Sequence, residues 1–133
     1  MEKKLIIVLF GFYCIYLFNL TLIRPEGVIY QSYNLELFKN LIMIYCNSKT
    51  TFFYLFLGNI FVFIPLGLFY RYLFKFGFFK TIVAVFLTSL IIEISQLVLK
   101  VGVFELDDLI LNTLGGIIGC VIYLLVERMK KNV

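Results

Sequence analysis

Four long apolar runs, separated by short segments that carry most of the charges, dominate the pattern of hydrophobic and polar positions. The runs cover about residues 5–23, 51–70, 81–99 and 109–126. Each is apolar on all sides when drawn as a helix, whereas a membrane β-strand alternates apolar and polar positions. A helix needs about 20 apolar residues to cross a hydrocarbon core about 30 Å thick. The pattern therefore predicts one all-α domain over residues 1–133, an integral membrane four-helix bundle.

The segment between the first two runs, residues 24–50, has a pattern typical of a short amphipathic helix. Its apolar side chains share one helical face, namely Leu35, Phe38, Leu41, Ile42 and Tyr45. Asn34 stands where its side chain could cap the N-terminus of that helix. The pattern fits a short amphipathic helix on the outer leaflet, and the alternative is an irregular loop packed over the mouth of the bundle.

The positions of lysine and arginine predict how the helices cross the membrane. With the N-terminus in the cytoplasm, eight of the 12 Lys and Arg residues fall inside and four fall outside. This excess favours a multi-pass protein of the cell membrane with both termini cytoplasmic. The first run is too long for a signal peptide and lacks a small-x-small cleavage site, so we expect it to remain as an anchor. The net charge of +4 then reflects topology and contact with the inner leaflet, and we expect no nucleic-acid partner.

Composition agrees with this assignment and limits the chemistry. Hydrophobic residues make up 62% of the chain and charged residues 15%, whereas a soluble domain of this length needs more polar surface. The chain has no histidine, and its three cysteines have spacings that suit neither a zinc site nor a disulfide framework. We therefore expect membrane lipids as partners, and neither a metal nor another cofactor.

Glu93 is the one charged residue (Asp, Glu, Lys or Arg) inside the four runs. Burying an unpaired charge in lipid costs several kcal/mol, so an acid at this depth is a candidate functional residue that faces the bundle interior. Gln96 lies three residues after Glu93 and Ser89 four residues before it, so the three side chains share one helical face. This face predicts a polar stripe on the third helix that meets polar groups from its neighbours.

Polar side chains at a similar level occur in the other spans. Together they predict a pocket open towards the outside, lined by Asn59, Glu93, Gln96, Asp107, Asp108 and Asn112. A structural interpretation stands beside this functional one. The amides could simply join helices by hydrogen bonds, and either aspartate could cap the fourth helix, where a carboxylate satisfies free N–H groups.

Proline and glycine positions point to close packing. Pro65, followed by Gly67, favours a kink in the second helix because proline removes one backbone donor. Gly115 and Gly119 form a Gly-x-x-x-Gly pattern that lets another helix approach closely. We interpret these four residues as packing and kink positions, not as chemistry.

Three of these segments together form a specific pattern. They are NIFVFIPLG (59–67), EISQ (93–96) and FELDDLILNTLGGIIG (104–119). In order and spacing the pattern resembles the VanZ-like family of bacterial membrane proteins. Family members often carry an arginine in the outer turn before the acidic stretch, where this chain has Val101, so a role for that arginine does not carry over. The resemblance implies a cell-envelope protein that raises tolerance to teicoplanin-type lipoglycopeptides, and it implies no established catalytic mechanism.

Three functional hypotheses follow. The first is a non-enzymatic protein whose outward pocket engages an amphiphile, such as a lipoglycopeptide or an envelope lipid. The second is an intramembrane enzyme or proton-coupled carrier for a lipid-linked envelope precursor, in which Glu93 and Asp107 or Asp108 act as acid and base. The third is an assembly protein whose polar residues only hold the helices together. The absence of a nucleophile motif or a phosphate-binding loop favours the first.

Overall fold

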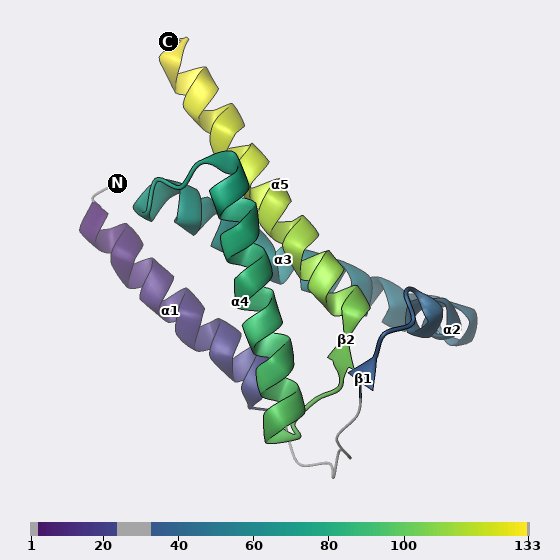
Figure 1. The fold of residues 1–133 in the computed structure, drawn as a ribbon. Helices are drawn as coiled ribbons and strands as arrows, with labels where there is room; N and C mark the ends of the chain where they lie inside the picture. Colours follow the sequence, from purple (N-terminus) through teal and green to yellow (C-terminus); the bar gives the residue numbers. More distant parts are fainter. Residues whose placement is uncertain (1–2, 24–32, 133) are drawn as a thin grey trace.

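The computed structural model describes residues 3–23 and 33–132, and these residues are almost entirely helical. The elements are α1 (Lys3–Leu22), β1 (Tyr33–Asn34), α2 (Lys39–Asn47), α3 (Lys49–Leu73), α4 (Phe78–Leu99), β2 (Phe104–Glu105) and α5 (Leu106–Lys131), as Figure 1 shows. Four of the helices, α1, α3, α4 and α5, are long and apolar enough to cross a membrane. The prediction of an all-α membrane bundle with one additional short helix is confirmed.

All four long helices begin before the apolar runs that predicted them, and α3 and α5 also end after them. α3 begins at Lys49, where the hydroxyl of Ser48 accepts a hydrogen bond from the backbone N–H of Thr51 at 3.3 Å. α5 begins at Leu106 and continues to Lys131, with basic residues in its last turn. The apolar runs mark the part of each helix that fits the hydrocarbon, whereas the backbone hydrogen-bond pattern continues into the flanking polar residues.

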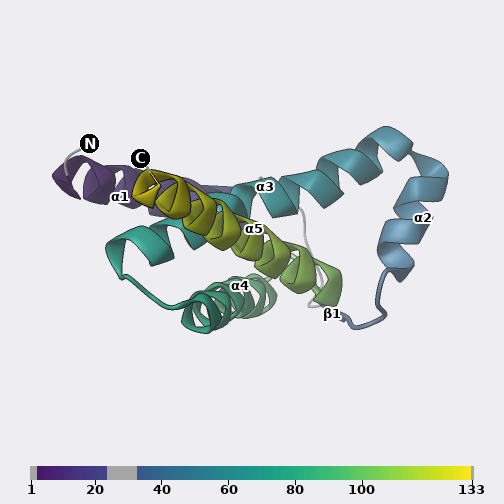
Figure 2. The same cartoon turned by 90° about the horizontal axis from the view of Figure 1, so that it is seen from above.

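The helices alternate in direction, so the two termini lie at the same end of the molecule (Figures 1 and 2). α1 and α4 run away from that end, and α3 and α5 return to it. The most extensive contact joins α3 and α5, which run parallel and are not neighbours in the chain. α4 packs on α5, and α1 contacts α3 and α4. The core of the bundle is therefore the parallel α3–α5 pair.

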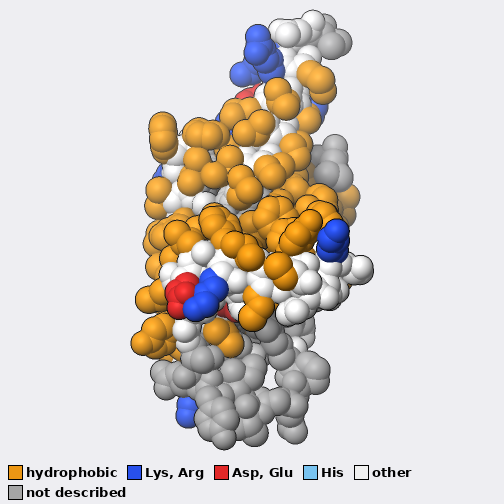
Figure 3. Space-filling model, turned by 90° about the vertical axis from the view of Figure 1, so that its right-hand side faces the viewer, with side chains coloured by type: hydrophobic (Ala, Val, Ile, Leu, Met, Phe, Trp, Pro, Cys, Tyr) orange, Lys and Arg blue, Asp and Glu red, His pale blue; other side chains and the backbone are white. Residues whose placement is uncertain are grey.

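Apolar side chains cover most of the outer surface. Tyr54 is 79% exposed and Phe79 is 81% exposed, and many leucines, isoleucines and valines on all four long helices are also exposed. Figure 3 shows hydrophobic side chains in a broad band over one face, with lysine or arginine side chains near the end where α5 ends and others below and beside the band. Such a band is unfavourable in water and favourable in lipid, which agrees with a membrane protein.

A short helix follows the first span, as one of the two alternatives for this segment predicted. The capping role predicted for Asn34 is wrong, because α2 begins only at Lys39 and Phe38 occupies the N-cap in a left-handed conformation with φ of 58°. The side-chain oxygen of Asn34 instead accepts a bond from the N–H of Glu36 at 3.1 Å. Leu41 is buried where α2 meets α3.

A two-residue parallel pairing connects the segments before α2 and α5. Tyr33 pairs with Phe104, and Asn34 pairs with Glu105. Two residues are too few to show a strand pattern, so the sequence analysis did not predict this pairing. It matters for the site because β2 leads directly into the first turn of α5, which carries Asp107 and Asp108.

Candidate functional site

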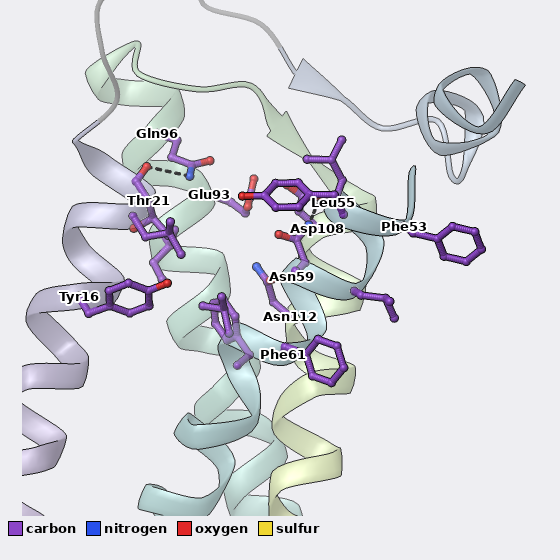
Figure 4. Close-up of a pocket in the computed structure, with 17 residues that line it drawn as sticks. Tyr16, Thr21, Phe53, Leu55, Asn59, Phe61, Glu93, Gln96, Asp108 and Asn112 are labelled. Atoms are coloured by element: carbon purple, nitrogen blue, oxygen red, sulfur yellow. Dashed lines mark hydrogen bonds between the residues drawn. The ribbon is translucent and has the colours of Figure 1, made fainter. Parts of the chain in front are cut away.

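A cavity of about 720 Å³ lies between the four long helices, near the end of the bundle at which β1 and β2 pair. Five of the six residues predicted for the pocket line it: Asn59, Glu93, Gln96, Asp108 and Asn112. Figure 4 shows these side chains converging from α3, α4 and α5, with Tyr16 and Thr21 from α1 at one side. The rest of the lining is largely apolar and comes mainly from α1 and α3.

Glu93 lies in the interior, as its position in the sequence predicted. The residue is 2% exposed, and its Oε2 accepts a hydrogen bond from the backbone N–H of Glu105 at 3.1 Å. Glu105 is the N-cap residue of α5, so the carboxyl group of Glu93 lies near the N-terminus of that helix. The positive end of a helix dipole favours a carboxylate there, which makes a buried acid less costly at this position.

Asp108 and Asn59 join α5 to α3. The Nδ2 of Asn59 donates a hydrogen bond to Oδ1 of Asp108 at 2.6 Å. Both side chains line the cavity, so this pair forms part of its polar end. The same contact serves the structural interpretation of these residues, because it holds two helices together.

Asn112 lies one turn further along α5 and contacts α4. Its Nδ2 donates to Oγ of Ser89 at 2.9 Å, and the residue is only 5% exposed. Its other side-chain atom, Oδ1, is buried and has no hydrogen-bond partner among the described residues. A buried acceptor without a donor is unfavourable unless a ligand or water supplies one, so this atom is a candidate contact for a bound molecule.

Gln96 connects α4 to α1 at the upper edge of the cavity. Its Nε2 donates to the backbone oxygen of Thr21 at 3.1 Å (Figure 4). This oxygen belongs to the last turn of α1, where carbonyl groups lack helical donors. A Cβ on Gly102 would come within 3.1 Å of the Gln96 side chain, so the turn between α4 and β2 packs directly on it.

Asp107 lies outside the cavity, which differs from the predicted pocket. It is 2% exposed, and its Oδ1 accepts a hydrogen bond from the backbone N–H of Phe38 at 2.8 Å. Successive residues of a helix point about 100° apart, so two adjacent aspartates cannot face one cavity equally. Asp107 therefore holds the start of α2 against α5, while Asp108 faces the cavity.

One polar contact and two polar lining residues at this end were not predicted. The side chain of Asn40 donates to Oε1 of Glu105 at 2.7 Å, which adds a second bond between α2 and the start of α5. Thr21 and Tyr16 line the cavity from α1. Their polar character within an apolar run was the available signal, but a single hydroxyl is common in membrane helices and gives little information by itself.

Three of the four packing residues, Gly67, Gly115 and Gly119, determine how closely α3 and α5 approach. A Cβ built on Gly115 would collide with the backbone oxygen of Ile60, and one on Gly119 with that of Ile64. A Cβ on Gly67 would collide with the backbone oxygen of Gly116. Glycine is therefore required at these crossings, and the close approach brings Asn59 within reach of Asp108.

Pro65 lies inside α3, which continues through it to Leu73. Proline cannot donate to the carbonyl of Phe61 one turn earlier. The next carbonyl, that of Val62, accepts a hydrogen bond from the hydroxyl of Tyr13 at 2.9 Å, which attaches α1 to this part of α3. The kink expected at Pro65 stays a prediction.

Metal-binding side chains do not cluster in residues 3–23 and 33–132, where no group of three or more His, Cys, Asp or Glu residues could hold an ion. Cys14 and Cys46 are exposed and Cys120 is buried, and none of them forms a disulfide. The chemistry offered by the cavity is therefore that of carboxyl groups, amides and hydroxyls beside an apolar surface.

Fold and site together define a helical membrane protein with a polar-ended cavity between its spans. The family model described as VanZ/LLP1 matches residues 5–127, and the chain belongs to this family. The chain is also similar to protein VanZ of Enterococcus faecium, with 37% identity over 68 residues. That match covers 50% of this chain and 42% of the relative, so less than half of the relative is represented. No solved structure matches the chain.

Proposed function

We propose that this protein contributes to tolerance of teicoplanin-type lipoglycopeptides by engaging an amphiphile in the cavity between its four spans. The amphiphile is the drug itself or an envelope lipid that carries a similar acyl chain and polar head. Membership of the VanZ/LLP1 family and the similarity to protein VanZ support the link to glycopeptide tolerance. The cavity has a polar end and an apolar remainder, and this lining supports an amphiphile as the bound molecule.

The division of the cavity into a polar end and an apolar remainder is the observation that carries this proposal. The polar end combines two acids with three amides, as described above. Leu20, Leu57, Phe61 and Ile92 contribute apolar surface to the same cavity. An acyl chain gains free energy from contact with apolar side chains, whereas a polar head requires hydrogen-bonding groups, so the lining matches both parts of one molecule.

Both termini lie in the cytoplasm in this proposal, and the polar end of the cavity lies near the outer membrane surface. Arg128, Lys130 and Lys131 in the last turn of α5 support this orientation, because basic residues accumulate on the cytoplasmic side. An extracellular amphiphile then reaches the polar end directly from the outer leaflet.

Cysteine labelling tests the orientation. Cys46 is exposed on α2, so a membrane-impermeant maleimide should label it in intact cells, and Cys46→Ser should remove that signal. Cys14 lies inside the first span and Cys120 is buried, so these two thiols provide the internal control. Labelling of Cys46 that appears only after the cells are permeabilised would place α2 in the cytoplasm and reject the proposed orientation.

A cavity-filling variant tests the function. Gly58 lines the cavity, and a Cβ built on it meets no atom within 4 Å, so we expect Gly58→Leu to add bulk to the cavity. In a teicoplanin-sensitive bacterium that expresses the protein, we expect this variant to lose most of the tolerance that wild type confers. The measurement is the minimal inhibitory concentration of teicoplanin.

Gly11→Leu is the matched control for that experiment. Gly11 lies on α1, does not line the cavity, and also has open space around a built Cβ. We expect this variant to behave as wild type, and neither variant should alter sensitivity to a glycopeptide that lacks the acyl chain. Wild-type tolerance with Gly58→Leu, at an equal level of membrane protein, would exclude the cavity as the functional site.

A further inference from the structure

The short helix α2 lies outside the cavity and packs with the two helices that form the core of the bundle. None of the 17 residues that line the cavity belongs to α2. Leu41 of α2 instead lies in one buried cluster with Ile60 of α3 and Leu111 of α5. These two residues directly follow Asn59 and precede Asn112 in the chain, and adjacent residues of a helix point about 100° apart. α2 therefore belongs to a core on another side of α3 and α5 than the cavity.

α2 also connects the starts of α3 and α5. Its C-terminal end continues into α3 through a single residue, Ser48. At its N-terminal end, the backbone N–H of Phe38 donates to Oδ1 of Asp107 at 2.8 Å. Nδ2 of Asn40 donates to Oε1 of Glu105 at 2.7 Å. Figure 2 shows α2 between the start of α3 and β1, so α2 is attached to α3 by the chain and to α5 by hydrogen bonds.

The bond to Asp107 supports an unusual backbone conformation at the start of α2. Phe38 has a φ of 58°, in the left-handed region, which is unfavourable for a residue with a Cβ. Its N–H reaches a carboxyl group that is buried, since Asp107 is only 2% exposed. A buried acceptor that loses its donor is left unsatisfied, which costs free energy. The contact therefore favours the attached position of α2.

Four consecutive residues at the start of α5 carry contacts to α2 and contacts to the cavity. The side chains of Glu105 and Asp107 accept from α2 and its N-cap, as described above. The backbone N–H of Glu105 donates to Glu93, which lines the cavity. Asp108 accepts from Asn59, and both of these residues also line the cavity. Residues of one helical turn move together, so a shift of this turn relative to α2 also shifts its cavity contacts.

We propose that α2 is a brace that positions the polar end of the cavity, with Asn40 and Asp107 as its positioning residues. Neither residue lines the cavity. They hold the first turn of α5 at the rotation that directs Asp108 towards Asn59. The effect of the brace on teicoplanin tolerance rests on the proposed function, whereas the positioning itself does not.

Asn40→Ala tests the brace, and Asn47→Ala is its matched control. Asn40→Ala removes the bond to Glu105, whereas Asn47 is an exposed residue at the end of the same helix. The full chain in detergent is observed by NMR of isotope-labelled protein, and the side-chain amide signal of Asn59 reports on its bond to Asp108. We expect this signal to shift in Asn40→Ala and to stay unchanged in Asn47→Ala.

Two substitutions of Asp107 give a second test. Asp107→Ala removes the acceptor for the N–H of Phe38, whereas Asp107→Asn keeps an oxygen there. We expect Asp107→Ala to shift the Asn59 signal and to lower the minimal inhibitory concentration of teicoplanin at least about threefold, in line with the loss of one hydrogen bond. Asp107→Asn should stay close to wild type in both measurements. If Asp107→Ala does not fold, Asn40→Ala decides the question.

The outcomes separate this inference from the proposed function. An unchanged Asn59 signal in the folded Asn40→Ala and Asp107→Ala proteins would overturn the brace, whatever their tolerance. A shifted signal together with lower tolerance, at an equal level of membrane protein, would support the brace and its role in tolerance.

Two mixed results are also decisive. A shifted signal with full tolerance in both brace variants, but with tolerance lost in Gly58→Leu, would overturn the role of the brace in tolerance and leave the proposed function standing. A shifted signal with full tolerance in all three variants would support the positioning by α2 and contradict the proposed function.

Discussion

Replacing Gly119 with leucine is expected to prevent stable assembly of the helix bundle. A Cβ at this position would collide with the backbone oxygen of Ile64 on α3, and a backbone atom cannot rotate away as a side chain can. Overpacking a core commonly costs about 1–3 kcal/mol, and we expect a cost above that range because α3 and α5 must separate along their whole crossing. Most of the folded, monodisperse protein should therefore be lost on extraction in detergent.

Gly11→Leu is again the control, because it makes the same chemical change on a helix where the added side chain meets open space. Size-exclusion profiles and thermal unfolding of the two variants measure the difference. In a background that carries Cys14→Ser and Cys46→Ser, the buried thiol of Cys120, one residue beyond Gly119, provides a convenient probe because a thiol-reactive dye reaches it only after unfolding. A Gly119→Leu protein that unfolds at the wild-type temperature would show that α3 and α5 do not pack as described.

Glu93→Gln is expected to abolish teicoplanin tolerance while leaving the fold intact. Glutamine has nearly the same shape and keeps an oxygen that can accept the hydrogen bond from the N–H of Glu105. Replacing the carboxyl group by an amide at this hydrogen bond should cost about 1 kcal/mol of stability, which a well-packed bundle tolerates. Under the proposed function, in contrast, the variant removes a carboxyl group from the lining of the cavity that binds the amphiphile. We therefore expect a normal folded yield and little or no tolerance.

Glu36→Gln makes the same substitution on the exposed segment before α2, where Glu36 pairs with Lys39 at 2.6 Å. An exposed pair contributes little, so this variant should match wild type in both yield and tolerance. Susceptibility and folded yield must be measured together for each variant. Full tolerance with Glu93→Gln would reject a functional role for the carboxyl group, and parallel loss of yield and tolerance would favour the interpretation that polar residues only hold the helices together.

The sequence by itself was sufficient to predict the four membrane helices. A hydrocarbon core requires about 20 apolar residues per crossing, so the four runs could hardly form anything else at this length. It also indicated that Glu93 faces inward, because an acid in contact with lipid is too costly. Both conclusions depend on the free energy of placing a side chain in lipid. That free energy depends on the residue itself and not on residues far away in the chain.

Only the tertiary structure decided which polar residues meet. The local pattern suggested that Asn34 caps the short helix. In the structure α2 begins at Lys39, and the N–H of its N-cap residue, Phe38, donates a long-range hydrogen bond to Asp107. The same bond turns Asp107 towards α2 and leaves Asp108 for the cavity, a choice between adjacent residues that depends on the rotation of α5 about its axis. That rotation is determined by the contact of Gly115 and Gly119 with the backbone of α3.

The parallel α3–α5 pair shows the same limit. Chain order favours contacts between consecutive helices, but the glycines on α5 let the backbone of α3 approach closely, although these two helices are not consecutive. Hydropathy thus determined which segments enter the membrane, since transfer into lipid depends on each segment alone. Packing determined the cavity, since its shape depends on backbone contacts between segments far apart in the chain.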